Sequence, residues 1–298
     1  MKPAPFVYHR PATLDEALAL LAEHGGEAKP LAGGQSLIPA MNFRLARPAV
    51  LVDLNRVAEL GYVRAGRDGL QIGAMTRQRA VERSDAVRGA APLLAEAMPF
   101  IAHPQIRNRG TVGGSLAHAD PAAELPAVML TLEARFRARN MKGERWIPAG
   151  EFFRGILETA LGPDELLVEV AVPESPARTG HAFEELARRH GDYALVGVAA
   201  RVTLDRRERC HAARITLFSV GDGPVLAAAA ALLDGQEPSP EAMRAAADAA
   251  AQRDIDPPSD IHASAAYRRR LAAVLTRRAL ARAVERATQA SRSDHERG

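Results

Sequence analysis

The sequence predicts a mixed α and β fold divided into two domains, and three observations support this prediction. Within the first 55 residues, segments typical of strand and helix alternate around a glycine turn, as in a small α/β unit. Residues 174–180 are polar and contain Pro176 and Gly180, which is typical of a linker. Beyond it, two apolar segments of strand type precede alanine-rich segments of helix type. At roughly 100–200 residues per domain, the 298 residues suffice for about two domains.

The amino-terminal unit begins with a clear helix signal. Residues 13–16, Thr-Leu-Asp-Glu, have the form of a capping box, leucines follow at helical spacing, and a Gly-Gly pair supplies the stop. Short strands are expected at 29–32 and at 50–52. Between them, Ser36 is a candidate cap for a short helix.

The region up to the linker mixes hairpins with helices. Its expected strands are 62–65, 70–73, 133–139 and 165–172, and its expected helices are 76–88 and 92–100. After the linker, the expected strands are 194–204 and 212–220, and the expected helices are 225–234, 240–252 and 264–288. Residues 287–298 are expected to fray.

Composition excludes several classes of protein. Cys210 is the single cysteine, so the chain holds no disulfide scaffold and no cysteine-ligated metal or iron–sulfur site. We find no membrane span, because no stretch of about 18 residues is apolar, and no leader of the secretory type. A cytoplasmic location is therefore expected.

The charge distribution argues against a nucleic-acid partner. The net charge is +3, but from Ser264 onward nine arginines face three acidic residues, so the rest of the chain is mildly acidic. A nucleic-acid-binding protein usually has a broader basic face. We favour a solvated helix face for this tail.

Common catalytic motifs are absent. The sequence has no P-loop, no HExxH or CxxC pattern, no GxGxxG before a helix and no GxSxG elbow. We expect neither a catalytic side chain nor a metal ligand in this chain.

Two glycine turns remain as candidate sites. Leu31-Ala32-Gly33-Gly34-Gln35-Ser36-Leu37 and Thr111-Val112-Gly113-Gly114-Ser115 both place glycines before a probable helix start. Glycine allows backbone N–H groups to converge on one anion, and a helix N-terminus favours negative charge. Two such turns can hold the two phosphates of one pyrophosphate.

Charged residues flank the second turn. Arg107 and Arg109 can each contact a phosphate or form an ion pair. Asp120 precedes Pro121, and this pattern favours an N-cap with proline at the first helical position over a contact with ribose hydroxyls. Glu124 is the other carboxylate placed to reach a ribose.

The segments 32–48 (AGGQSLIPAMNFRLARP) and 105–128 (QIRNRGTVGGSLAHADPAAELPAV) resemble the two FAD-binding signatures of molybdenum hydroxylase flavoprotein subunits. The nearest resemblance is to the medium subunit of aerobic carbon monoxide dehydrogenase, with the FAD domain of xanthine dehydrogenase more distant. Residues 191–202 (GDYALVGVAARV) resemble the start of the family's C-terminal domain. The resemblance extends from Met1 to about Arg286.

This resemblance implies the fold in more detail. Residues 1–175 should form a two-part FAD-binding domain of the vanillyl-alcohol-oxidase type, with subdomains at about 1–55 and 56–175. Residues 178–286 should form a smaller domain with a three-stranded antiparallel sheet and helices, and 287–298 a frayed basic tail.

The resemblance also implies a role. The chain should bind FAD, take electrons from two [2Fe–2S] clusters of a small subunit and pass them to an external acceptor. A large subunit with a molybdenum–pterin centre should oxidise the substrate, and the complex should be a dimer of heterotrimers. Flavin supplies the redox chemistry in such proteins.

Individual positions carry over from the family. The two glycine turns should enclose the pyrophosphate, and Glu124 should bond the ribose or adenine side. Isoalloxazine contacts are expected from Ile101, from Leu161 or Leu166, and from Tyr193. Relatives carry a lysine near residue 185, where this chain has Glu184-Glu185, so that contact is missing here or comes from elsewhere.

Other functions fit less well. A flavin-free assembly subunit would not need intact glycine turns. A stand-alone flavin oxidase would need a substrate domain, and no covalent-flavin motif is present. Binding of nucleic acid through the arginine-rich tail conflicts with the acidic remainder of the chain.

Overall fold

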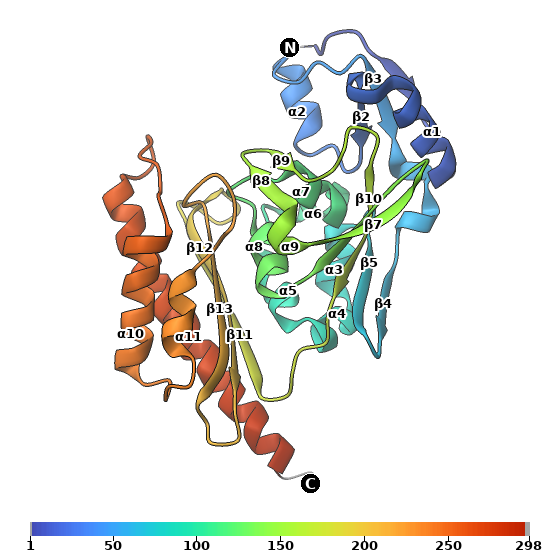
Figure 1. Cartoon of the computed structure of the whole chain (residues 1–298). Helices are drawn as coiled ribbons and strands as arrows, with labels where there is room; N and C mark the ends of the chain where they lie inside the picture. The colour runs from blue at the N-terminus through green and yellow to red at the C-terminus, as the bar shows by residue number, and fades with distance from the viewer. Residues whose placement is uncertain (1, 296–298) are drawn as a thin grey trace.

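The computed structural model describes residues 2–295, with side chains as far as residue 291, and its elements form three packed units (Figure 1). The amino-terminal unit is a parallel sheet in the order β1-β3-β2, formed by Val7–His9, Val50–Asp53 and Ala28–Leu31. Helix α1 (Leu14–His24) packs on β2 and β3, and α2 (Leu37–Asn42) follows the first glycine turn. The capping box is confirmed. The Thr13 hydroxyl accepts a hydrogen bond from Glu16 N, and the Glu16 carboxylate accepts one from Thr13 N.

The middle unit is an antiparallel sheet covered by helices. Its strands, in the order β4-β5-β10-β6-β7, are Val63–Gly66, Gly69–Gly73, Leu166–Val172, Arg135–Asn140 and Gly143–Pro148. Its helices are α3 (Gln78–Arg83), α4 (Asp85–Ala90), α5 (Pro92–Ala97), α6 (Pro104–Arg109), α7 (Val112–His118), α8 (Glu124–Thr131) and α9 (Ala149–Phe152). A short hairpin, β8 (Phe153–Gly155) and β9 (Glu158–Thr159), lies beside α7.

Two expected helices are interrupted. The helix expected at 76–88 breaks at Ser84, whose hydroxyl accepts from Val87 N and caps a new helix, α4. The helix expected at 92–100 ends as α5 at Ala97 and tightens into a 3-10 turn over Met98–Phe100, which contains Pro99. The expected strands and the first hairpin are present with small shifts of their ends.

The carboxy-terminal unit is an antiparallel sheet between two helical layers. Its order is β11-β12-β13-β14, with β11 at Thr179–Ala187, β12 at Ala194–Leu204, β13 at Cys210–Phe218 and β14 at Val225–Leu226. Helices α10 (Pro240–Ala249) and α11 (Ala265–His295) belong to this unit; α11 packs on β11 and β12, while α5 and α8 of the middle unit contact the sheet as well (Figure 1). The segment expected as a helix at 225–234 is β14 followed by a 3-10 turn.

The hydrophobic core crosses from the middle unit into the carboxy-terminal sheet. Phe183, Ala199 and Phe218 are each at most 1% exposed and join the cluster formed by the middle helices. A second cluster lies between this sheet and α10–α11, and a third joins α1 to β3 and to Leu166. The three units therefore dock through shared apolar side chains. Within the described residues, no helix is both long and apolar enough to cross a membrane.

The carboxy-terminal tail corrects two expectations. Helix α11 continues to His295, so residues 287–295 are helical rather than frayed, and 296–298 lie outside the described residues. Its arginines are not simply solvated, because Arg268 is 4% exposed and Arg282 and Arg286 both bind Glu96 of α5. Arg282 and Arg286 thus connect the carboxy-terminal unit to the middle unit, while Arg268 bonds within its own unit.

The fit between β11 and α11 gives a first prediction. A Cβ on Gly180 would lie 1.9 Å from the Ala283 carbonyl oxygen and 2.4 Å from the Ala287 nitrogen. We expect Gly180→Ala to lower the free energy of unfolding in urea by about 1–3 kcal/mol, because two backbones must separate. Gly89 lies within α4, and a Cβ there would meet no neighbouring atom. Gly89→Ala is therefore the matched control, and it should leave the free energy of unfolding unchanged or raise it slightly. Equal unfolding midpoints for the two variants would contradict this packing.

Candidate functional site

The two glycine turns lie against each other. A Cβ on Gly33 would lie 2.5 Å from the Arg109 carbonyl oxygen and 2.8 Å from Gly110 Cα. A Cβ on Gly114 would lie 3.2 Å from Ala32 Cβ. The turns come from different units, and only glycine permits this approach of their backbones.

The first turn presents unused donors. No described residue accepts a hydrogen bond from the backbone N–H groups of Gly34, Gln35 or Ser36. Gly34 has φ +72°, and the Gln35 side chain donates to the Gly33 carbonyl, which fixes the turn. Ser36 stands at the expected cap position of α2, but its hydroxyl makes no capping hydrogen bond. Converging N–H groups with a free hydroxyl form an anion-binding concavity.

The second turn uses its donors internally. Gly113 N donates to the Ala74 carbonyl at 2.8 Å, and Gly114 N donates to Thr111 Oγ1 at 3.0 Å. Ser115 N donates to the Thr111 carbonyl at 3.2 Å. The two turns are therefore not equivalent, although the sequence predicts the same role for both: the first offers N–H groups, while the second closes the start of α7.

Asn55 and Arg77 brace the turns, a role that sequence reasoning missed. Asn55 Nδ2 donates to the Ala32 carbonyl at 3.0 Å, and Arg77 donates to Asn55 Oδ1 at 2.6 Å and to the Arg109 carbonyl. Asp53 and Asn55 also form a turn cap after β3, since Asp53 Oδ1 accepts from Asn55 N. No local motif marks Arg77, because its partners are 22 and 32 residues away.

The structure resolves the choice for Arg107. Its guanidinium is 4% exposed and forms two hydrogen bonds with Glu82, at 2.9 and 3.1 Å. It also donates to the Ile101 carbonyl at 2.8 Å. Arg107 therefore forms an internal ion pair with Glu82 and holds the segment before the second turn in place.

Asp120 does not cap a helix as the sequence predicts. Helix α8 begins at Glu124 with Ala123 at the cap position, and Asp120 Oδ1 accepts from Ala122 N at 2.8 Å in a local turn. Proline at position 121 lies in this turn rather than at the first helical position. The preference for a helix cap is wrong, and one oxygen of Asp120 stays available toward Tyr193.

Carboxylates and a tyrosine meet where the middle and carboxy-terminal units join. Glu124 is 8% exposed, and burial together with the charge of Asp120 raises its pKa to about 7. Burial and the charge of Glu124 raise the pKa of Glu185 to about 8. Loss of hydration and the charges of Asp120 and Glu124 raise the pKa of Tyr193, which also hydrogen-bonds Asp120. The ring of Tyr193 remains exposed, at 69% for the whole residue.

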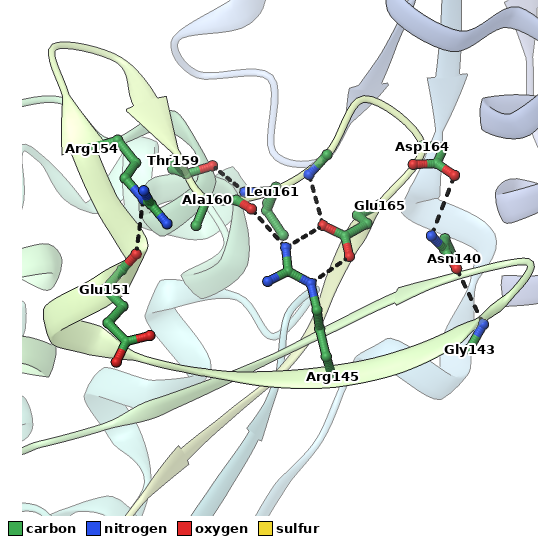
Figure 2. Close-up of polar contacts among 11 residues, drawn as sticks. Asn140, Gly143, Arg145, Glu151, Arg154, Thr159, Ala160, Leu161, Asp164 and Glu165 are labelled. Atoms are coloured by element: carbon green, nitrogen blue, oxygen red, sulfur yellow. Dashed lines mark hydrogen bonds and ion pairs between the residues drawn. The ribbon is translucent and has the colours of Figure 1, made fainter.

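An ion-pair network holds the segment that carries Leu161 (Figure 2). Arg145 of β7 donates to both carboxylate oxygens of Glu165, at 2.8 and 2.7 Å, and to the Ala160 carbonyl at 2.7 Å. Glu165 also accepts from Gly162 N, and Thr159 accepts from Leu161 N. The hydrogen bond from Arg145 lowers the pKa of Glu165. This network fixes the loop between β9 and β10.

The expected apolar contacts differ in accessibility. Leu161 is partly buried beside the middle core, whereas Leu166 is 3% exposed within the cluster that joins α1 to β10. Ile101 is 7% exposed and precedes the second turn. Among these leucines, the geometry favours Leu161 as the one that can meet a ligand. The described residues contain no group of three or more side chains suited to a metal ion.

Family models match nearly the whole chain. Residues 4–175 match the FAD binding domain in molybdopterin dehydrogenase, and residues 181–283 match the CO dehydrogenase flavoprotein C-terminal domain.

Two curated relatives align along all or nearly all of their own length. Subunit alpha of the 6-hydroxypseudooxynicotine dehydrogenase complex of Paenarthrobacter nicotinovorans is 46% identical, over 99% of this chain and 100% of the relative. Caffeine dehydrogenase subunit beta of Pseudomonas sp. (strain CBB1) is 42% identical, over 96% and 97%.

Solved structures agree with the fold. A chain of carbon monoxide dehydrogenase from Hydrogenophaga pseudoflava superposes with a TM-score of 0.92 at 41% identity, covering 96% of this chain and 99% of that one. A chain of quinoline 2-oxidoreductase from Pseudomonas putida 86 gives 0.91 at 38% identity, with coverages of 96% and 99%.

The contact between the turns gives a second prediction. Gly33→Ala should weaken FAD binding about ten- to a hundred-fold, because its Cβ forces the turns apart at a cost of order 1–3 kcal/mol. The measurement is the dissociation constant from quenching of flavin fluorescence. Gly26→Ala, whose Cβ meets open space, is the control and should bind as the wild type. Unchanged affinity in Gly33→Ala would show that the contact does not shape the site.

Proposed function

Because this chain belongs to the family of FAD-binding subunits of molybdopterin-dependent dehydrogenases, we propose that it passes electrons from iron–sulfur clusters of a partner through FAD to an external acceptor. The chain is an oxidoreductase subunit, and it is the FAD-bearing component of that type of complex. The observation that carries the proposal is the junction of the two glycine turns, where the backbones meet and the first turn leaves three N–H groups without a partner among the described residues.

The residues of the site fit FAD. The N–H groups of Gly34, Gln35 and Ser36 can bind a phosphate, with the Ser36 hydroxyl beside them. The Ser115 hydroxyl at the second turn makes no hydrogen bond with a described residue, so it can donate to the other phosphate. FAD, when bound, supplies the redox chemistry, and the protein supplies binding and electrostatics.

The remaining site residues orient the flavin in this proposal. Ile101 and Leu161 offer apolar surface, and Tyr193 offers an exposed aromatic ring in the loop 188–193, which packs on His103 through Gly191. The bracing by Asn55 and Arg77 holds the turns at a fixed separation. Asp120 and Glu124 are the carboxylates next to the second turn.

The proposed partners are an iron–sulfur small subunit and a molybdopterin large subunit, assembled as a dimer of heterotrimers. The relatives are named for oxidising different molecules, among them caffeine and carbon monoxide, while the subunits that match align with 96% and 94% of this chain. This comparison supports substrate choice by a partner rather than by this chain. The cytoplasmic location stays a prediction.

The test has two stages. First, the purified chain should show a flavin absorption spectrum and release about one FAD per chain on denaturation. Second, anaerobic addition of the small subunit with reduced [2Fe–2S] clusters should bleach the flavin absorption as the cluster absorption returns. The clusters are one-electron donors, so two reduced clusters should be consumed per FAD.

Either stage can refute the proposal. A chain that takes up no FAD, even with its partner subunits present, would favour a structural role in assembly. A chain that holds FAD but is not reduced by the small subunit, while dithionite reduces it, would refute the electron path and leave FAD binding intact. The Gly33→Ala chain controls for direct reaction between the clusters and free flavin.

A further inference from the structure

Glu185 lies in β11, and its neighbours across the carboxy-terminal sheet are apolar residues. Its register partner in β12 is Gly197, and Gly197 in turn pairs with Phe218. The phenyl ring of Phe218 fills the space over Gly197, since a Cβ there would lie 2.0 Å from the ring. This face of the sheet packs against the middle unit. The carboxyl of Glu185 therefore points toward the FAD-binding domain rather than toward α11.

One oxygen of this carboxyl has no partner. Glu185 Oε2 is buried, and no described residue hydrogen-bonds to it. Its neighbour Glu184, on the opposite face, pairs with Arg282 at 2.6 Å. A buried carboxylate without a partner is costly, so a neutral acid is the form that this position favours.

Helix α8 packs on β12, the strand beside β11, and its first residue, Glu124, is a second carboxyl whose charge acts on Glu185. Glu124 occupies the first turn of α8, where the helix N-terminus favours the ionised form. Two carboxyls that repel each other in a desolvated site resist ionising together, so the two groups jointly retain a proton near neutral pH. The pKa values of about 7 for Glu124 and about 8 for Glu185 agree with this arrangement.

The other charged groups around the pair do not neutralise it. Asp120 adds negative charge near Glu124, and Tyr193 is hydrogen-bonded to Asp120. Arg107 is the one cation that acts on Glu124, and its guanidinium is bound to Glu82. From β12, Gly197 contributes no charge. The pair thus sits in a net negative environment, and its member Glu124 begins the helix that packs on α7 after the second glycine turn.

We propose that Glu124 and Glu185 form a proton-binding pair that takes up one proton when FAD is reduced. This inference rests on the proposed function. The electrons come one at a time from iron–sulfur clusters and bring no protons. FAD with two electrons and one proton becomes FADH⁻, which adds one negative charge. The pair, holding one proton before reduction, binds a second one from solvent, so two electrons enter with two protons and the charge of the junction is unchanged.

The test is the pH dependence of the reduction potential of bound FAD, measured by equilibration with redox dyes between about pH 7 and 9. One extra proton per two electrons steepens the slope by about 30 mV per pH unit. We expect the wild type to have this steeper slope and Glu185→Gln to lose it. Glu184→Gln is the matched control on the opposite face of β11 and should keep the wild-type slope.

A second readout needs no flavin. Because the folded state holds the proton more tightly than the unfolded chain, the unfolding free energy of the wild type should fall as pH rises from about 5 to 8. Glu185→Gln should flatten this dependence between about pH 5 and 8. Glu124→Gln tests the other half of the pair if Glu185→Gln does not fold.

The outcomes are distinguishable. Bound FAD with equal slopes in the wild type and in Glu185→Gln would overturn the proton pair and leave the proposed function standing. A chain that binds no FAD would overturn both. A loss of the steeper slope in Glu184→Gln as well would assign the effect to general electrostatics and also overturn the pair.

Discussion

The close approach of Gly33 to the backbone of residues 109 and 110 is the constraint on which the site depends. One turn follows a strand of the small parallel sheet, and the other connects two helices of the middle unit. The contact between the turns therefore exists only when these units are docked. Docking is enforced by a core that joins α1 and β3 to Leu166 and Val168 of β10. The core between α1, β3 and β10 thus fixes the backbone geometry at the two glycine turns.

The two glycine turns have different roles in binding an anion. The second turn satisfies its own N–H groups through Thr111 and the Ala74 carbonyl, so it is rigid before any ligand arrives. The first turn leaves its N–H groups free, and a ligand must satisfy them. Unsatisfied donors of this kind are tolerated only where solvent or a ligand reaches them. The bracing by Arg77 and Asn55 links the rigid turn to the open one, which limits how far the open one can relax.

Local signals in the sequence predicted local structure well. The capping box at Thr13, the hairpin around residues 67–69 and both glycine turns are set by neighbours within a few positions. Features that depend on distant partners were missed. The break at Ser84 and the docking of Arg282 on Glu96 need tertiary contacts, and Glu96 lies 186 residues from its arginine. Strand β11 carries charges at 184 and 185, so its pattern does not resemble a buried strand.

The placement of Glu185 shows why such positions escape sequence reasoning and yet matter for function. Successive residues of a strand face opposite sides, so Glu184 reaches Arg282 of α11 while Glu185 faces the middle unit. A shift of one residue in β11 would exchange their environments and give Glu185 the arginine. The register is set by the packing of Gly180 on α11 and of Phe183 in the core. Hydrophobic packing therefore decides which carboxyl pairs with an arginine and which is buried without a partner, and with it the charge that a redox group bound at the junction would meet.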